Sequence, residues 1–295
     1  MTTVQIEQPI LSLMNVGATY GSGWRGARGV ADAGPLVEGG KESRPLKQHD
    51  LPWDMDGVKN ISLEIRAGEF FGLVGESGSG KTTLARLITG QLPCGEGNII
   101  FKGTDITGLK GKKRILATGR GIQMVFQDPY NSFNPQLSIG FQMEEPLLIG
   151  GIKDATRRRA MAMEMLDKIG LSAEYMERYP RELSGGQLQR IAIGAALIGS
   201  PDLLIADEPV SALDVSVQAQ ILDLFQHLRD ELKFACLFIS HDLNVVYYLC
   251  DKVAVLSKGE LAEQGSVEQV YHRPSSACAR VLTGRVRFTD EDEQT

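Results

Sequence analysis

The chain has 295 residues, and its 31 Lys and Arg against 37 Asp and Glu give a formal net charge of −6. Hydrophobic residues make up 42% and charged residues 23% of the chain, as in ordinary globular proteins with a sizeable core. Wholly disordered, collagen-like and disulfide-scaffold chains are therefore excluded. The acidic balance also argues against a nucleic-acid partner, because sequence-independent binding of DNA or RNA needs an excess of Lys and Arg.

Targeting and redox signals are weak in this sequence. The longest apolar stretch, around Ile191–Gly199, is far shorter than the about 18 to 20 residues of a membrane-spanning helix. The N-terminal run MTTVQIEQPILSL holds no Lys or Arg, which the first part of a signal peptide requires. Cys94, Cys236, Cys250 and Cys278 lie far apart without a CxxC pair, which favours free thiols over a zinc or iron–sulfur site. We expect a protein that stays inside the cell.

The first third of the chain is rich in short strand patterns. Runs of β-branched and aromatic residues predict strands over 10–16, 60–65, 69–74, 98–102 and 121–126. The segment 20–57 is rich in glycine and has no sustained apolar period, which indicates a flexible surface insertion. After the third strand, a glycine-rich turn leads into the helical sequence KTTLARLITGQL.

Helices dominate from about residue 138 to residue 200, where Met, Leu and Ile recur at spacings of three and four. Strands and helices then alternate, with strands at 203–206, 235–239 and 252–256 and helices at 215–232 and 242–249. This alternation predicts a parallel sheet covered on both faces, with the helical block inserted as a second subdomain. We expect one domain over 1–275 and a short extension over 276–295 that ends in the acidic sequence DEDEQT.

The glycine-rich turn fits the pattern G-x-x-x-x-G-K-[ST] between a strand and a helix. Its residues are Gly75, Glu76, Ser77, Gly78, Ser79, Gly80, Lys81 and Thr82, followed by Thr83 at the start of the helix. In such a loop the backbone N–H groups turn toward phosphate oxygens, the lysine supplies a charge, and the threonine hydroxyl can ligate Mg²⁺. The alternative is a strand-to-helix turn that binds nothing.

Two carboxylates follow the apolar strand at 203–206. An aspartate at the carboxyl end of a strand beside a phosphate loop, here Asp207, can hold Mg²⁺. Glu208, the next residue, would be placed to polarise a water that attacks the γ-phosphate. The alternative is a solvated strand end with two ordinary acids.

Further motifs occur in the order found in ABC-type ATPases, and the chain resembles that family over about residues 10 to 275. The sequence LSGGQ precedes a helix, VFQDP and SALD lie on either side of it, and FISHDL follows. The resemblance implies the fold class, an α/β P-loop nucleotide-binding domain with an inserted helical subdomain and an antiparallel β subdomain. It also implies ATP and Mg²⁺ as cofactors and ATP hydrolysis as the activity.

The resemblance implies roles for single residues. Catalysis would fall to Glu208, to His241 as the γ-phosphate switch histidine, and to Gln127 of the Q-loop. The Mg²⁺ ligands would be Thr82, Gln127 and Asp207. Nucleotide would be contacted by the signature residues Ser184, Gly185, Gly186 and Gln187, and by Asp214 of the D-loop. By themselves, His241 is also compatible with a structural role and Gln127 with a plain polar loop residue.

The signature lies at a helix N-terminus, where unpaired N–H groups favour an anion. By resemblance it closes on ATP bound to a partner's phosphate loop. For the adenine, relatives use an aromatic side chain, and Tyr20 is the best positional match. Trp24 and Trp53 compete with it, and a buried sheet-edge tyrosine is the alternative.

The run DEPVSALDVSVQAQI further resembles the ATP-binding subunits of dipeptide, oligopeptide and nickel importers. This subgroup implies a second, usually non-identical ABC ATPase subunit, two transmembrane permease subunits and an extracytoplasmic solute-binding protein as partners. It also implies peripheral attachment to the cytoplasmic face of the inner membrane, and peptide as the preferred solute. One departure is that YHRPSSA replaces the usual His-Pro-Tyr-Thr stretch.

Two other functions compete with transport. A soluble ABC ATPase acting on DNA or ribosomes would carry a long coiled-coil insertion or two cassettes, and the sequence has neither. A nucleotide-binding module without turnover would not need both Glu208 and His241.

Overall fold

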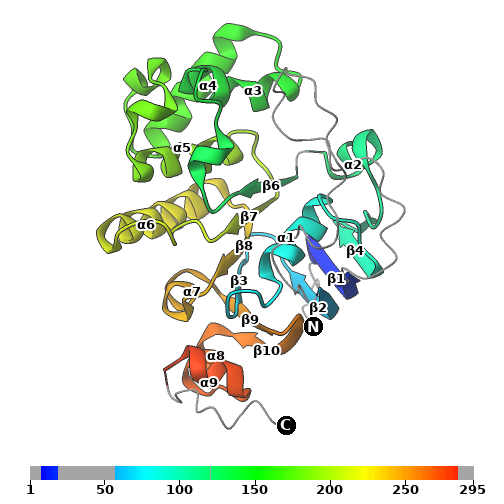
Figure 1. Ribbon diagram of the computed structural model, residues 1–295. Coiled ribbons are helices and arrows are strands. Elements are labelled where there is room, and N and C mark those ends of the chain that lie inside the picture. The colour runs from blue at the N-terminus through cyan, green and yellow to red at the C-terminus, as the bar shows by residue number, and fades with distance from the viewer. Residues whose placement is uncertain (1–7, 19–56, 120, 285–295) are drawn as a thin grey trace, which may run out of the picture.

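The computed structural model describes residues 8–18, 57–119 and 121–284, which form two sheets and a lobe of helices (Figure 1). The candidates for adenine stacking, Tyr20, Trp24 and Trp53, lie outside these residues, as do nearly all of the expected insertion over 20–57 and the acidic end. Among the described residues no helix is long and apolar enough to cross a membrane.

The larger sheet has the strand order β10-β9-β3-β8-β7-β6. Its strands are β3 (Phe70–Val74), β6 (Ile122–Val125), β7 (Leu203–Asp207), β8 (Ala235–Ser240), β9 (Lys252–Ser257) and β10 (Glu260–Ser266). Neighbouring strands from β9 to β6 run parallel, and β10 is antiparallel to β9 at the edge. The parallel sheet expected from the strand–helix alternation is therefore present, with an added antiparallel edge strand.

Both faces of this sheet are buried because the side chains of each strand alternate between two apolar cores. On β3, Phe70 and Val74 belong to one core, and Phe71 and Leu73 belong to the other. A strand buried on both faces reads as a continuous apolar run, which is why FFGLV was recognisable in the sequence.

A four-stranded antiparallel sheet, ordered β2-β1-β4-β5, supplies the second core together with the first helix. Its strands are β1 (Leu11–Ala18), β2 (Val58–Ile65), β4 (Glu96–Phe101) and β5 (Thr104–Asp105). The pairing of β1 shifts register after Leu13, next to Asn15, which adopts a left-handed conformation with φ 52°. This is the antiparallel β subdomain that the resemblance implied.

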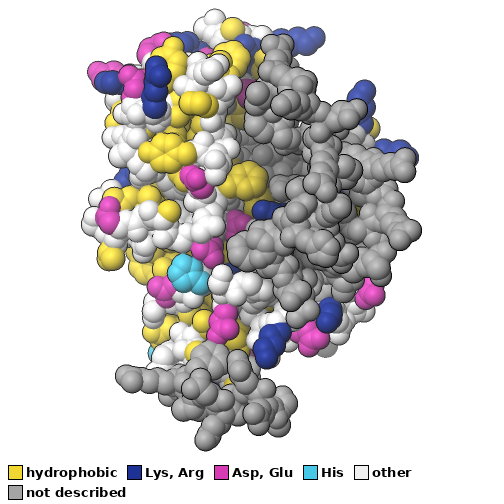
Figure 2. All heavy atoms as spheres, viewed as in Figure 1, with side chains coloured by type: hydrophobic (Ala, Val, Ile, Leu, Met, Phe, Trp, Pro, Cys, Tyr) yellow, Lys and Arg dark blue, Asp and Glu magenta, His cyan; other side chains and the backbone are white. Residues whose placement is uncertain are grey.

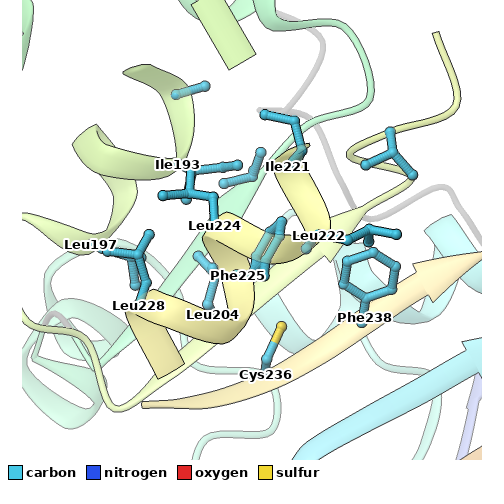
Figure 3. Close-up of a cluster of buried hydrophobic side chains, with 14 of the residues drawn as sticks. Ile193, Leu197, Leu204, Ile221, Leu222, Leu224, Phe225, Leu228, Cys236 and Phe238 are labelled. Carbon is cyan, nitrogen blue, oxygen red and sulfur yellow. The ribbon is translucent and has the colours of Figure 1, made fainter. Parts of the chain in front are cut away.

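The helices that cover the sheets begin and end as follows: α1 (Lys81–Thr89), α2 (Gly111–Thr118), α6 (Val215–Leu232), α7 (Leu243–Leu249), α8 (Val267–His272) and α9 (Ala277–Leu282). Figure 3 shows how α6 inserts Ile221, Phe225 and Leu228 between α5 and the strands β7 and β8. The helix expected from KTTLARLITGQL ends earlier than its sequence suggests, because Gly90 adopts a left-handed C-cap at φ 76°.

A helical lobe over residues 139–197 lies at the upper end of the molecule in Figure 1, opposite α8 and α9. It consists of α3 (Ile139–Ile149), α4 (Ala155–Lys168), the short helices η4 (Ala173–Glu177) and η5 (Pro180–Glu182), and α5 (Gly185–Leu197). The helices expected between about 138 and 200 are therefore present. The short helix η3 (Pro129–Ser132) connects β6 to this lobe.

Candidate functional site

The glycine-rich loop joins the carboxyl end of β3 to the first turn of α1. A Cβ atom at Gly75 would lie 2.2 Å from the Leu256 carbonyl oxygen, so only glycine fits between the loop and β9. Gly80 has φ 102°, and a Cβ there would lie 2.7 Å from a methyl of Val58. These two glycines let the backbone curl tightly beneath the start of the helix.

Lys81, the first residue of α1, is buried inside this curl with 5% of its surface exposed. Its Nζ donates hydrogen bonds to the carbonyl oxygens of Gly75 at 2.7 Å and Glu76 at 2.8 Å. Burial lowers the pKa of the ammonium from its ordinary value, although Glu208 and Asp207 oppose that shift. A buried cation held by two neutral carbonyls leaves positive charge at the mouth of the loop for an anion.

The loop also offers hydrogen-bond donors that suit a phosphate group. The hydroxyl of Ser79 is buried, and no partner is found for it among the described residues. The N-terminus of α1 has no side-chain cap, because the preceding residue is Gly80. Uncapped N–H groups, an unpartnered hydroxyl and a buried ammonium are the donors that a polyphosphate requires.

Thr82 and Asp207 meet beside the loop, at the carboxyl end of β7. The Thr82 hydroxyl donates to Asp207 Oδ1 at 3.2 Å. Burial raises the pKa of the Asp207 carboxyl, while the hydrogen bond from Thr82 and the charges of Arg86 and Lys81 pull it down. A buried carboxylate of this kind is better satisfied by a cation than by a hydroxyl alone.

Mg²⁺ fits this pair because it prefers oxygen ligands and retains waters or phosphate oxygens in the rest of its shell. Within the described parts of the chain, no group of three or more His, Cys, Asp or Glu side chains could hold a metal on its own. Thr82 and Asp207 would supply two oxygen ligands, and phosphate oxygens and waters would supply the others.

Glu208 is the centre of a hydrogen-bond network that unites three of the candidate catalytic residues. Its Oε2 accepts from Gln127 Nε2 at 3.3 Å and lies 3.2 Å from Nδ1 of His241. Gln127 Nε2 also lies 3.3 Å from the hydroxyl of Ser211. Side chains from two other segments thus converge on one carboxylate oxygen next to the phosphate loop.

The backbone at Glu208 is held in an unusual conformation. Its φ is 48°, which is uncommon for a residue other than glycine. The Glu208 N–H donates to the Ile239 carbonyl at 3.0 Å, and its own carbonyl accepts from the Ser211 hydroxyl at 3.1 Å. Ser211 therefore fixes both Gln127 and the turn that aims Glu208.

The signature residues form the N-terminus of α5. Ser184 caps the helix by accepting from the Gln187 N–H at 3.3 Å, and Gln187 Oε1 accepts from the Ser184 N–H at 3.0 Å. This reciprocal capping box leaves the N–H groups of Gly185 and Gly186 available for an anion. Gln187 Nε2 also donates to the Tyr175 hydroxyl at 2.8 Å, which ties the signature to η4.

Asp214 caps α6 in the same way, accepting from the Val217 N–H at 3.0 Å and the Ser216 hydroxyl at 2.6 Å. These hydrogen bonds lower the pKa of its carboxyl. The hydrogen bonds described for Ser184, Gln187 and Asp214 all stay within their own helix termini and η4. The structure therefore brings Lys81, Thr82, Asp207, Glu208, Gln127 and His241 together, and keeps the signature in a group of its own.

Comparison with known proteins agrees with this geometry. The model of the ABC transporter family matches residues 58–211. The oligopeptide transport ATP-binding protein AmiF of Streptococcus pneumoniae is 43% identical over 234 residues, which cover 79% of this chain and 76% of AmiF. The chain belongs to the ABC transporter family. As an ABC ATPase, it uses ATP with Mg²⁺ and hydrolyses the nucleotide.

Two solved structures of ABC ATPases are similar to this one. The ATP-binding cassette MJ0796, described as a dimer in a post-hydrolysis state with ADP and Pi, has a TM-score of 0.68 and 27% identity, covering 87% of this chain and 98% of that one. CbiO1 of Clostridium perfringens, part of the transporter complex cbiONQ, has a TM-score of 0.71 and 25% identity, covering 90% and 92%. Neither these structures nor AmiF favours action on DNA or ribosomes.

Two side chains that sequence reasoning left without a role also contribute to the site. Ser211 begins the SALD motif. It forms hydrogen bonds with Gln127, 84 residues earlier in the chain, and with Glu208, three residues earlier. Tyr130 donates from its hydroxyl to the Leu183 carbonyl at 3.2 Å, across 53 residues of sequence. Neither contact leaves a periodic or spacing signal that a single sequence could reveal.

Proposed function

We propose that this ABC ATPase is the energy-coupling subunit of a peptide importer at the cytoplasmic face of the inner membrane. The name of AmiF, an oligopeptide transport ATP-binding protein with 43% identity, supports the peptide class. The observation that carries the catalytic part is the convergence of Gln127 and His241 on the Glu208 carboxylate beside a complete phosphate loop.

Each residue has a defined task in the proposed mechanism. Lys81, the Ser79 hydroxyl and the free N–H groups at the start of α1 bind the β- and γ-phosphates. Thr82 and Asp207 would hold Mg²⁺, joined by Gln127 when nucleotide is bound, and the metal would neutralise charge on the phosphate oxygens. Glu208 takes the proton of the attacking water, and His241 donates to the γ-phosphate as charge develops on it.

For Glu208 to act, its Oε2 must exchange its present donors for a water. Gln127 and His241 lie on loops at the ends of β6 and β8, so both can turn toward the nucleotide without disturbing the sheet. The hydrogen bonds seen here thus hold the three groups near one another before the nucleotide redistributes them.

The separate position of the signature supports a dimeric mechanism. Ser184 and the two glycines offer an anion site at the start of α5, but their hydrogen bonds do not reach the phosphate loop of the same chain. In the proposed dimer, each signature binds the γ-phosphate held by the other subunit, which in this subgroup is usually a non-identical ATPase, and Asp214 lies at the same interface. ATP then favours the closed dimer, and hydrolysis releases it.

The helical lobe is the proposed receptor for a permease subunit. The complete system would contain two permease subunits and an extracytoplasmic solute-binding protein. Phe141, Leu148 and Ile149 recur on one face of α3 and are between half and three-quarters exposed. Hydrophobic side chains are visible on this lobe in Figure 2. Exposed apolar side chains grouped on one helix face are typical of a protein–protein contact.

The direct test of the catalytic role is the substitution Glu208→Gln. It keeps the size and the hydrogen bonds of the side chain but removes the proton acceptor, so ATP binding should persist while turnover falls at least about 100-fold. Binding of a fluorescent ATP analogue and release of phosphate measure the two quantities. Turnover near that of the unchanged protein would mean that Glu208 is not the base.

The transport role is tested by purifying the tagged chain from its native membranes. Recovery of permease and solute-binding subunits supports the importer and identifies its pathway. Ribosomes or DNA-repair factors in their place would contradict it.

A further inference from the structure

The loop after β6 connects the hydrogen-bond network around Glu208 to the segment that leads into the signature. At its first end, Gln127 bonds to Glu208 and Ser211. Asp128 then caps the short helix η3, accepting from the Tyr130 N–H at 2.9 Å and from Asn131 Nδ2 at 2.9 Å. Because both acceptor oxygens of Asp128 are used within this turn, residues 127–131 form a stiff unit rather than a loose connection.

At its second end, the loop is tied to the residue that precedes the signature. The Tyr130 hydroxyl donates to the carbonyl of Leu183 at 3.2 Å, and Ser184 follows directly as the N-cap of α5. The side chain of Leu183 is 7% exposed, so that segment is well packed, whereas Tyr130 is 50% exposed. A half-exposed ring adds little to the core, and its specific contribution lies in the hydroxyl.

We propose that Tyr130 is a positioning residue that fixes the signature relative to Gln127 and thereby to the catalytic carboxylate. Movement of Gln127 toward bound nucleotide then shifts η3 and, through the Tyr130 hydroxyl, the N-terminus of α5. This inference rests on the proposed function, in which the signature of one subunit binds the nucleotide of the other.

The proposal predicts different effects on nucleotide binding and on dimer closure, whereas general damage to the fold would weaken both. The hydrogen bonds of Tyr130 go to Asp128 and Leu183, so loss of the hydroxyl should leave nucleotide binding to the phosphate loop of the same chain unchanged. Without the hydroxyl, the signature is held less rigidly, so ATP-dependent closure of the dimer becomes weaker. Loss of one hydrogen bond of ordinary strength predicts a change of about two- to tenfold.

The test is Tyr130→Phe in the Glu208→Gln background, which prevents hydrolysis. Trinitrophenyl-ATP reports binding to the phosphate loop, and light scattering measures ATP-dependent association of the chain with itself or with the second ATPase recovered from the membrane complex. We expect unchanged analogue affinity and an association constant reduced about two- to tenfold. The matched control is Tyr248→Phe, because the Tyr248 hydroxyl also donates to a surface acceptor, Asp223 Oδ1 at 2.8 Å, on α6.

A second variant loosens the signature at a contact that does not involve Tyr130 and is a positive control for the association measurement. Tyr175→Phe removes the hydroxyl that accepts from Gln187, and it should weaken association without changing analogue affinity. Unchanged association in Tyr130→Phe overturns the proposal, as does an equal loss of analogue binding and association. If Glu208→Gln itself binds no nucleotide or never associates, the proposed function fails and the role of Tyr130 fails with it.

Discussion

Asp207 shows at the scale of one residue how a binding site costs stability. Its carboxyl is 5% exposed, and burial raises its pKa above the ordinary value. At neutral pH the folded chain must therefore hold an ionised group that the interior disfavours. The hydrogen bond from Thr82 and the charges of Lys81 and Arg86 only partly offset that burial.

We predict that Asp207→Asn stabilises the nucleotide-free chain at pH 7 and abolishes Mg²⁺-dependent hydrolysis. The amide oxygen can still accept from Thr82, but no charge is buried. Since the raised pKa disfavours the ionised form in the folded state, the penalty is absent below the ordinary carboxyl pKa and grows as pH rises through the folded value. Thermal unfolding without nucleotide should give a higher Tm for Asp207→Asn at pH 7, and the gap should narrow in acid. A lower Tm at pH 7 would show that attraction to Lys81 and Arg86 outweighs burial.

Most of the candidate site could be predicted residue by residue from the sequence, because its motifs are local. The phosphate loop, Asp207 and Glu208 each lie within a short run whose pattern implies the chemistry. The contacts of Ser211 and Tyr130 join loops that are far apart in the chain, so only the fold reveals them. The adenine contact at Tyr20 remains a prediction, since that residue lies outside the described parts of the chain.

At the scale of elements, the packing of α7 against β3 depends on a glycine. A Cβ atom at Gly72 would lie 2.2 Å from a methyl of Val246, and both residues belong to the buried interior. The helix that follows His241 therefore lies directly against the strand that leads into the phosphate loop. This close approach links the position of His241 to that of the loop.

We predict that Gly72→Ala destabilises the protein by about 1 to 3 kcal/mol, because a methyl would overlap Val246 in a packed core. Val246→Ala creates a small cavity at the same place and should also destabilise. The double variant should be more stable than the sum of the two effects by more than about 1 kcal/mol, because the new methyl occupies the space that is vacated. Urea unfolding of the four proteins measures this coupling, and simple additivity would contradict the proposed contact.

The sequence predicts helices and strands well wherever its apolar residues form a continuous run or recur at one regular spacing. Strands buried on both faces and the long helix α6 were located to within two residues of their ends. The edge strand β10 was missed because its polar sequence ELAEQGS alternates only weakly. In the structure, Lys258 and Gly259 both adopt positive φ in the tight turn from β9, as a two-residue hairpin requires. Gly259 is the sequence signal for this turn. The helix α2 was missed since it has no buried face.

At the scale of the whole molecule, each of the two apolar cores supports a different part of the candidate site. The core between the two sheets holds the phosphate loop through α1, and the core beneath α5, α6 and α7 holds the helical lobe against the same central strands (Figures 1 and 3). Gln127, Glu208 and His241 lie where these units meet, just after the carboxyl ends of β6, β7 and β8. The chain joins the sheet to the lobe between β6 and η3, and again between α5 and β7.

This arrangement predicts that docking and catalysis can be separated by mutation. Phe141 and Ile149 are 58% and 73% exposed on α3, and neither touches the Glu208 network. Phe141→Ser with Ile149→Ser should leave the unfolding free energy of the isolated chain within about 0.5 kcal/mol and leave ATP binding unchanged. Recovery of permease subunits from membranes should fall at least about tenfold, since exposed aromatic and apolar anchors carry most of the energy of such contacts. The matched control is Met14→Ser, because Met14 is 53% exposed on β1 of the antiparallel sheet. Equal loss of permease in the control, or full recovery with the α3 variant, would place the docking surface elsewhere.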